Sequence, residues 1–594
     1  MADVHRVSLG HDSVLLYLKR GQRSKILSPW AADTLLRGRN FLTLEEHSKA
    51  LSSLDVEKST PYHQLLEELV REGFLISKNA FLKACSGQSS SRREDPISIL
   101  SFLTRNRVKS LERAVNSYIQ NNLKFGRDIP ILIVDASPEA SVQAQYQEML
   151  RLIKKTTGRQ INYIGENEKS AYAEALVKEK GLPQEVVHFA LFDAEGLGFT
   201  YGLNRNLLLL ETTGKKMAMF DDDTVCRLTE APGRGQALSV LSAVDPTEFC
   251  FYSNFSAIEE TVPFIEEDIL KIHEQLLGKD LCECIHASGS RVNIDQMNAS
   301  FMEKIMGGGG HVLATMTGVV GDSGMGSVPS YYLTLSGDSR QRLLQTEEGY
   351  RVYLKNRQVL RKVSFPTITD GPFWMTTSCS MDNRDLLPPF LPVLRNEDGL
   401  FGLMLRKCIP NGYFGYLPWA LLHHPIEEPR SSSDDFALKA LYVNCVDILI
   451  YLVSGFEFVS ADVNVVERLK ALGEYLMELG SLPIEDFEMI FLEKVWKAKS
   501  EYLQRLESIL KFYRESPNFW AEDVKKYLHS IRESLGRKDF SVPRTLKKDL
   551  EDDDLKKLNQ KMVLCFGKLL VYWPEMVQAA RELHQDGRSI SRSL

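Results

Sequence analysis

Between residues 97 and 220, short apolar runs alternate with segments whose apolar residues recur at three- and four-residue steps. The runs predict buried strands at 97–103, 129–134, 160–164 and 217–220. The periodic segments predict helices at 110–119 and 199–210. Strand and helix in alternation predict an α/β unit with a mostly parallel, Rossmann-like sheet, whose ligand site lies at the carboxyl edge.

The first 85 residues follow another pattern. Strands are predicted at 14–18 and 74–76, and helices at 27–36, from 42 onward and at 62–72. Ser28 and Thr43 are the candidate caps of the first two helices, and Gly73 ends the third. Together they predict a winged-helix-like α+β module over 1–85.

The last 160 residues are helical in pattern. Apolar stripes at helical spacing run through 436–454, 463–479, 484–512 and 555–584. They predict an all-α domain over 435–594. The charged segment 547–554 is either a solvated connection or a helix start. This helical domain is expected to pack on the middle unit, to bind an acceptor or to mediate self-association, and the sequence leaves these open.

Two polar stretches separate the three units. Residues 86–96 are Ser-rich and read as a linker, and 427–435 form a second break, so the middle unit covers 97–430. A long insertion over about 228–370 contains the glycine-rich segments 306–311 and 318–326. Such glycine density predicts either a mobile lid over the ligand or a disordered insertion.

Composition narrows the class of protein. A net charge of −7 over 594 residues gives no general attraction to nucleic acid, and the balanced charge of the first module disfavours DNA binding. The most apolar late segment, 440–456, contains Asp447, so no membrane span is expected. Nine scattered cysteines without a Cys-x-x-Cys pair and the lack of a signal-peptide pattern predict a cytoplasmic protein.

The strand at 217–220 runs directly into Asp221, Asp222 and Asp223. Three carboxylates at one strand end repel one another and are costly to bury unless a positive group neutralises them. A divalent cation that holds a diphosphate would do so, because hard oxygen ligands suit Mg²⁺ or Mn²⁺. An acidic turn in water is the alternative interpretation of the same residues.

The order of motifs over 97–425 resembles the A-type, inverting, family-2-like glycosyltransferases, which bind nucleotide sugars. Thr104, Arg105 and Arg107 stand in the first nucleotide-binding turn, Asp135 where the base is recognised, and Arg205 in the segment before the metal motif. The aspartates stand at the Asp-x-Asp position. The resemblance implies that Asp223 ligates the metal, that Asp221 contacts ribose or metal, and that Arg205 contacts the diphosphate. Asp222 is either a further donor contact or a sheet-end carboxylate.

Two later segments extend the resemblance. Glu397 and Asp398 resemble the acidic pair that begins the acceptor-side helix, where Asp398 first and Glu397 second would take the acceptor's proton. An acidic helix start that complements the dipole is the alternative. His423 and His424 end an apolar run, and either imidazole would complete a Mn²⁺ shell unless it is structural.

The N-terminal pattern, from the Leu-Ser-Pro-Trp segment at 27–30 to the Gly-Phe-Leu-Ile segment at 73–76, resembles PqqD-like peptide-recognition domains. Those domains bind the leader of a ribosomally made peptide. An exposed strand edge suits such binding by strand addition.

These resemblances predict a metal-dependent hexosyltransferase that moves a sugar from a nucleotide donor, first a UDP-sugar, to a leader-bound ribosomal peptide. Two alternatives stay open: a cell-envelope or secondary-metabolite glycan as acceptor, and a non-catalytic peptide-binding scaffold. The sequence does not choose between oxygen, nitrogen and sulfur acceptors, nor does it decide the oligomeric state.

Overall fold

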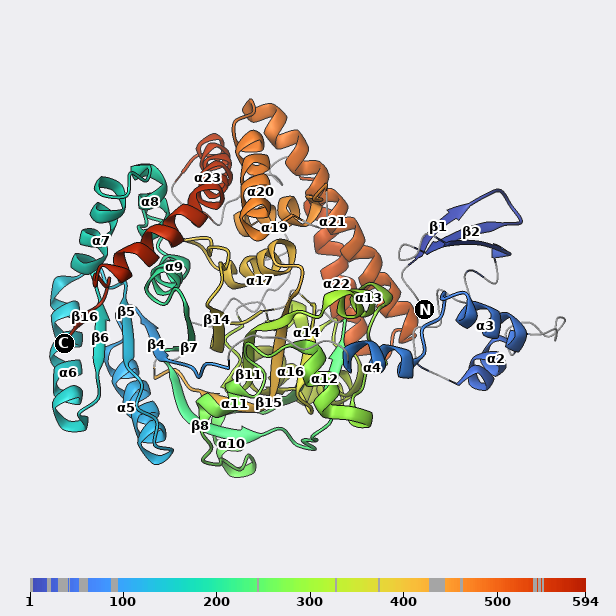
Figure 1. Ribbon diagram of the computed structural model, residues 1–594, viewed down its shortest axis with the longest axis horizontal. Coiled ribbons are helices and arrows are strands. Elements are labelled where there is room, and N and C mark those ends of the chain that lie inside the picture. The colour runs from blue at the N-terminus through green and yellow to red at the C-terminus, as the bar shows by residue number, and fades with distance from the viewer. Residues whose placement is uncertain are drawn as a thin grey trace.

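The computed structural model describes residues 4–18, 23–29, 32, 41, 43–52, 62–86, 94–242, 245–325, 328–371, 374–426, 444–459, 463–537, 542, 546 and 550–594. Figure 1 shows a large α/β body with a small module beside it, at the N-terminal end of the chain. Most of the predicted helix 27–36, the central part of the predicted linker 86–96 and the break 427–435 lie outside the described residues.

Four parallel strands form the part of the sheet that the sequence predicts. They are β4 (Ile99–Thr104), β5 (Ile131–Asp135), β6 (Ile161–Ile164) and β7 (Lys215–Asp221), in the order β6-β5-β4-β7. The helices along this part are α5 (Val108–Lys124), α6 (Ala140–Thr157), α7 (Glu166–Lys178), α8 (Gln184–Leu191) and α9 (Tyr201–Glu211). The strands are almost wholly buried, which explains their unbroken apolar runs.

The direction in which successive strands are added to the sheet reverses after β6. From β4 the chain builds outward through β5 and β6, and then returns to place β7 on the other side of β4. Leu103 pairs with Asp221, so the carboxyl ends of β4 and β7 lie next to each other. Open α/β sheets bind ligands at such a switch point, in the crevice beyond the strand ends.

Beyond β7 the sheet becomes mixed and reaches thirteen strands. β14 (Ser378–Asn383) runs antiparallel to both β7 and β11 (His311–Asp322), whereas β11 is parallel to β15 (Gly412–His423). The remaining strands are β8 (Thr224–Glu230), β9 (Ser239–Leu241), β10 (Glu248–Phe251), β12 (Gln358–Lys362), β13 (Thr367–Thr369) and β16 (Arg592–Ser593). The molecule is therefore α/β, with a parallel core that antiparallel strands extend.

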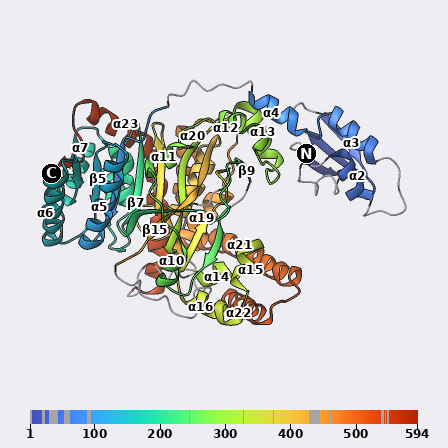
Figure 2. The ribbon, with the colours of Figure 1, turned by 90° about the horizontal axis from the view of Figure 1, so that it is seen from below.

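The helices of this second half are mostly short. They are α10 (Phe255–Thr261), α11 (Ile269–Glu274), α12 (Leu281–Ser288), α13 (Ala299–Gly308), α14 (Val328–Tyr332), α15 (Gly337–Leu343), α16 (Glu347–Lys355) and α17 (Glu397–Cys408), with a 3₁₀ turn at Gly289–Arg291. In Figure 2 the sheet extends through the body from β5, among α5, α6 and α7, to β9, near α12 and α13.

The glycine-rich segments are neither lid nor disordered insertion where the structure describes them, which corrects that prediction. Gly318 and Gly321 lie inside the buried strand β11. A Cβ at Gly318 would lie 2.1 Å from the carbonyl oxygen of Arg361, and one at Gly321 would lie 2.3 Å from that of His423. These glycines therefore allow close approach between strands rather than mobility.

The N-terminal module contains a three-stranded antiparallel sheet, β1 (Val4–Ser8), β2 (Val14–Leu18) and β3 (Arg23–Leu27), with β2 in the middle. Two helices, α2 (Leu44–Ser52) and α3 (Tyr62–Arg71), accompany it. Thr43 caps α2 as predicted. Its Oγ1 accepts a hydrogen bond from the Glu46 amide at 3.1 Å, and its own amide donates to Glu46 Oε2 at 2.8 Å.

The predicted strand at 74–76 is wrong. The amides of Phe74 and Leu75 both donate to the carbonyl of Leu69, at 2.8 and 3.1 Å, and so close the end of α3. The chain then enters α4 (Lys78–Ser86), which packs against α12 and α13 of the body and buries Phe81 and Cys85 there. Figure 2 shows this helix as the connection between module and body.

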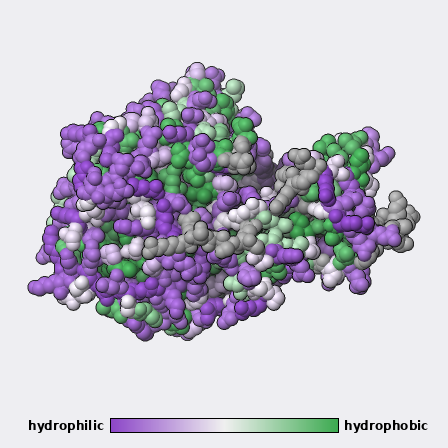
Figure 3. Space-filling view, viewed as in Figure 1, coloured by the Kyte–Doolittle hydropathy of each residue, from purple (hydrophilic) through white to green (hydrophobic). Residues whose placement is uncertain are grey.

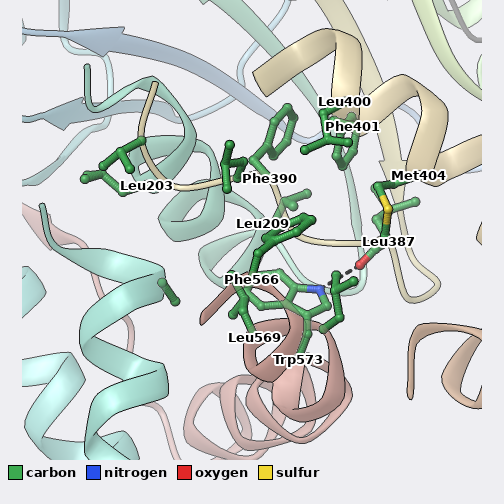
Figure 4. Close-up of a cluster of buried hydrophobic side chains, with 14 of the residues drawn as sticks. Leu203, Leu209, Leu387, Phe390, Leu400, Phe401, Met404, Phe566, Leu569 and Trp573 are labelled. Carbon is green, nitrogen blue, oxygen red and sulfur yellow. Dashed lines mark hydrogen bonds between the residues drawn. The ribbon is translucent and has the colours of Figure 1, made fainter. Parts of the chain in front are cut away.

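The helical segment is confirmed, but it does not form a core of its own. Its helices are α19 (Cys445–Gly455), α20 (Val465–Gly480), α21 (Ile484–Phe512), α22 (Asn518–Leu535), which the sequence pattern missed, and α23 (Asp552–Gln585). Figure 4 shows Trp573 of α23 packed with Leu209 and Leu387, and its indole donates to the Leu387 carbonyl at 2.7 Å. One continuous apolar cluster joins α19, α20, the first part of α21 and α23 to α9 and α17. Helix α22 and the end of α21 pack in a second cluster with α14, α15 and α16. Of the three roles left open, packing on the middle unit is therefore observed.

The face of the molecule in Figure 3 is mostly hydrophilic, with scattered hydrophobic patches. Among the described helices, none combines the length and apolarity that crossing a membrane requires.

Candidate active site

The three aspartates lie at the switch point between β4 and β7. Asp221 is the last residue of β7, and Asp222 and Asp223 form the turn into β8. Asp222 is 4% exposed and Asp223 5%, so the run is no acidic turn in water. Burial of three carboxylates requires compensating partners, and the surrounding residues supply them.

Asp222 is held from the end of β4. Thr104, the last residue of that strand, donates its hydroxyl to Asp222 Oδ2 at 2.7 Å. The hydroxyl of Tyr146, from α6, lies 2.7 Å from Thr104 Oγ1 and accepts the amide of Arg107 at 2.6 Å. Tyr146 thereby fixes the whole turn after β4. Sequence reasoning missed it, because an aromatic residue in an amphipathic helix is normally part of the core.

Arg107 joins two of the aspartates. Its Nη1 lies 3.1 Å from Asp222 Oδ1 and 2.7 Å from Asp223 Oδ2. The Arg107 side chain is 44% exposed, whereas the two carboxylates are nearly covered. The turn that the sequence assigned to nucleotide binding thus contacts the aspartates, a contact that the sequence did not predict, and its positive charge is open to solvent.

The structure distinguishes the two histidines. His423, the last residue of β15, places Nε2 3.0 Å from Asp223 Oδ1 and Nδ1 2.7 Å from the carbonyl of Asp322. His424 contributes its amide to the Asp223 carbonyl at 3.1 Å, but its ring stacks on Phe255 with centroids 3.9 Å apart. Only His423 thus directs its ring to the aspartates, and the His424 imidazole is not positioned as a ligand.

Asp322 is a fourth carboxylate at the same edge that the sequence did not reveal. It ends β11, is 3% exposed, and binds Arg357 Nη2 at 2.7 Å and the Gly324 amide at 2.7 Å. Its carbonyl orients His423. A Gly-Asp pair inside a glycine-rich segment carries no distinguishing pattern, so only the pairing of β11 with β15 brings it here.

A second group of charges lies on the other side of Asp221. Arg205 of α9 is 4% exposed and pairs with Glu397 at the start of α17, and its Nη2 also donates to the hydroxyl of Thr376. The charges of Asp221 and Asp398 act on the same guanidinium. Asp398 is less covered than Glu397 and accepts the amide of Gly399 at 2.9 Å.

Arg205 therefore pairs with the acidic pair through Glu397, and the charge of Asp221 helps to raise the pKa of the same guanidinium. That the aspartate run and the acidic pair face one site stays a prediction.

Burial and mutual repulsion give the three aspartates different pKa values. Burial, with the Asp223 charge, raises the pKa of Asp222 to about 7 and also raises that of Asp221. Burial alone would raise the pKa of Asp223 too, but His423 and Arg107 hold it well below the usual range. Burial tends to lower the pKa of His423, and Asp223 overrides it, so that the pKa is about 9. The Asp223 and His423 pair thus concentrates the charge of the site.

Burial also acts on the acidic pair at α17. It raises the pKa of Glu397 to about 7, against the Arg205 charge, and it raises the pKa of Asp398. A carboxyl group with a raised pKa is a better proton acceptor near neutral pH than an exposed aspartate.

The two remaining predicted residues, Asp135 and Arg105, lie beside Thr104 at the end of β4. Asp135 ends β5 and accepts the Tyr163 hydroxyl and the Ser137 amide, both at 2.7 Å. Burial raises its pKa. Arg105 donates to the carbonyl of Gly198, in the loop before α9, and does not contact the aspartates.

No set of three or more histidine, cysteine, aspartate or glutamate side chains is arranged to hold a metal ion within the described part of the chain. A separate hollow of about 360 Å³ is lined by Glu230, Lys271 and Trp419 among others, and none of the predicted site residues lines it. Glu230 stands at the far end of β8 from the aspartates.

Comparison with known proteins adds no family to this geometry. No protein-family model matches the chain, and the search of curated proteins found no similar sequence. The functional argument therefore depends on the arrangement of the residues themselves.

Proposed function

We propose that the protein is a metal-dependent, inverting glycosyltransferase that uses a nucleotide sugar, first a UDP-sugar, and modifies a ribosomally made peptide. One observation carries the proposal. At the sheet's switch point the buried Asp223 contacts Arg107 and His423, and the buried Arg205 pairs with Glu397 at the start of α17; all of these residues are among those that the sequence predicts. A nucleotide diphosphate is the kind of ligand that such an edge binds in α/β proteins.

The residue types suit a hard divalent cation, although the described side chains do not form a ligand set as they stand. Asp221, Asp223 and His423 would hold Mn²⁺ or Mg²⁺ once His423 loses the proton that Asp223 favours, since carboxylates and a neutral imidazole are suitable ligands. His423 already has the orientation that ligation needs, because the Asp322 carbonyl lies at Nδ1 and Nε2 is directed to Asp223. When bound, the ion would supply charge stabilisation to the departing diphosphate.

The chain's own cations support the same chemistry. As the bond from the anomeric carbon to the diphosphate breaks, negative charge grows on the phosphate oxygens. Arg107 is half exposed above the aspartates and Arg205 is buried beside Asp221, so both can face that charge. A guanidinium binds two phosphate oxygens at once and thus fixes the leaving group's orientation.

Asp398 is the better general base of the acidic pair. Glu397 is committed to the buried ion pair with Arg205, so removal of its charge would leave an arginine without its partner. Among the described residues, Asp398 has no ion-pair partner comparable to Arg205, and it would take the proton of an acceptor hydroxyl, thiol or amide as that atom attacks the anomeric carbon. Glu397 then acts as a positioning residue.

The N-terminal module supports a peptide acceptor. Its sheet has β1 and β3 as outer strands, and an outer strand can pair with an extended peptide through main-chain hydrogen bonds. Helix α4 joins the module to the body through buried contacts, so a peptide held there stays near the catalytic unit. The PqqD-like pattern of the sequence agrees with this role.

Intact-mass spectrometry tests the proposal directly. A candidate precursor peptide is incubated with the full-length protein, Mn²⁺ and each of a panel of UDP- and GDP-sugars, with and without its leader. We expect a mass gain of one hexose-type unit with one donor, and loss of that gain after EDTA or leader removal.

Other outcomes redirect the proposal in defined ways. Nucleotide release without a change in peptide mass would favour a glycan or water as acceptor. Leader-dependent peptide binding without any release would favour the non-catalytic scaffold.

A further inference from the structure

The loop before α9 connects the turn after β4 with the segment that leads into α17. Arg105 Nη1 donates to the carbonyl of Gly198 and lies 3.4 Å from Thr200 Oγ1. Between these two residues, the carbonyl of Phe199 accepts the amide of Leu394 at 2.9 Å, just before α17 begins. The loop is therefore bonded to the diphosphate side and to the acidic side of the candidate site.

The start of α9 is fixed against the same segment. The amide of Leu203 donates to the carbonyl of Pro392 at 2.7 Å. A Cβ at Gly202 would lie 1.7 Å from the carbonyl oxygen of Leu391, so only a glycine allows this close approach. Tyr201, the residue before this glycine, consequently has a defined backbone position between the two sides of the site.

The Tyr201 side chain is an exposed aromatic group at this position. It is the first residue of α9 and is 42% exposed, and within the described ranges its hydroxyl has no hydrogen-bond partner. Arg205 follows one helical turn later and so lies on the same side of α9. Burial lowers the pKa of Arg107, the two aspartates beside it raise it, and the Tyr201 hydroxyl adds to that rise, so the hydroxyl lies near this guanidinium.

We propose that Tyr201 contacts the transferred sugar of the bound nucleotide sugar and helps to determine which hexose is accepted. The inference rests on the proposed function, which assigns Arg107 to the diphosphate and Asp398 to the acceptor's proton. The group that lies between a diphosphate and an acceptor is the sugar. A tyrosine suits it, because the ring packs on the C–H groups of a pyranose and the hydroxyl bonds to a sugar hydroxyl.

Isothermal titration calorimetry tests the contact apart from turnover. UDP, UDP-glucose, UDP-galactose and UDP-N-acetylglucosamine are each titrated into the full-length protein with Mn²⁺ present. For the UDP-sugar that binds most tightly, Tyr201→Ala should raise Kd about tenfold, while Kd for UDP should stay within about twofold. Tyr201→Phe keeps the ring and loses one hydrogen bond, so its loss should be about fivefold and should reduce the preference among the three sugars.

Phe365→Ala is the matched control. Phe365 is an equally exposed aromatic residue at 42%, but it lies against Gly235, which lines the separate hollow near Trp419. Its removal should change no nucleotide affinity by more than about twofold. Melting curves of all variants verify that each one is folded.

The affinities separate failure of this inference from failure of the proposed function. If Tyr201→Ala weakens UDP as much as the UDP-sugar, or if both Tyr201 variants bind the UDP-sugar as the unmodified protein does, this inference alone is wrong. If neither UDP nor any UDP-sugar binds the unmodified protein, the proposed function with a UDP-sugar is wrong as well.

Discussion

The chain contains two runs of three consecutive aspartates, and they have opposite surroundings. Residues 221–223 end a buried strand, where Thr104, Arg107 and His423 contact them. Residues 552–554 form the first turn of α23, where Asp553 and Asp554 are exposed. In the second run, Lys557 Nζ lies 3.9 Å from Asp554 Oδ1, within the same helix.

The comparison shows that the preceding residues, not the acidic run, distinguish the two. A helix start gains from negative charge near its amides, so the second run serves the local backbone. A buried strand end has no such use for three charges, and each must find a partner elsewhere in the chain. A functional role is therefore expected only for the run whose neutralisation comes from several distant segments.

From this comparison, the largest loss of sugar transfer is expected on substitution of Asp223. If the proposed function holds, Asp223→Asn should reduce sugar transfer by about a thousandfold, because it removes the proposed metal ligand and the partner of both His423 and Arg107. Initial rates of peptide modification at saturating donor measure the loss. Asp553→Asn is the control and should stay within about twofold of the unmodified protein, and an equal loss in both would contradict the distinction.

The second-largest effect is expected at the acidic pair of α17, where two variants distinguish the general base from the positioning residue. Asp398→Asn should lower kcat by about a hundredfold or more with little change in donor KM, as expected when a general base is lost. Glu397→Gln should lower thermal stability as well as activity, because it leaves the buried Arg205 without its charge partner. Rates and melting curves for both variants separate the two roles. A greater loss of kcat in Glu397→Gln, with stability unchanged, would exchange them.

A smaller effect, on the pH dependence of thermal stability, is expected at Asp222. Because burial raises its pKa from 3.8 to about 7, the folded protein keeps a proton in that window that the unfolded chain has lost. This group's contribution to stability therefore decreases as the pH rises towards 7. The Tm of Asp222→Asn, minus that of the unmodified protein, should become more positive from pH 5 to pH 8. A difference that stays flat or falls would show that the carboxylate is not penalised by burial.

The smallest effect is expected in the second aspartate run. Asp554→Asn weakens only the interaction with the helix N-terminus and a distant lysine, so Tm should fall by about 2 °C or less. Differential scanning calorimetry measures this shift, and sugar transfer should be unaffected. A marked loss of transfer would mean that the exposed run also takes part in function.

Much of the fold follows from local pattern. The buried runs around β4, β5, β6 and β7 have no polar alternation, and this pattern identifies parallel strands covered on both faces. Helix α21 is predicted with its observed bounds, because a long apolar stripe at constant spacing leaves no other choice. The strand at 74–76 fails because its amides close the end of α3, a hydrogen-bond choice that hydrophobicity does not record.

The sequence pattern selected the charged residues of the candidate site but missed the residues that orient them. Asp223, Arg107 and His423 carry chemistry in their residue types, so a sequence pattern can select them. Tyr146 and Asp322 act only through the partners they orient, and those partners lie far away in the chain.

By itself, then, the sequence determined the parallel strands β4 to β7 and the long C-terminal helices other than α22, and it selected the charged residues from which diphosphate and cation binding are proposed. These properties depend on side-chain chemistry and on neighbours a few positions away. Only the tertiary structure decided that His423 rather than His424 faces the aspartates, that Arg205 pairs with Glu397, and that the glycine-rich strand β11 lies inside the sheet. Those outcomes depend on strand order and register, which bring together segments up to 200 residues apart.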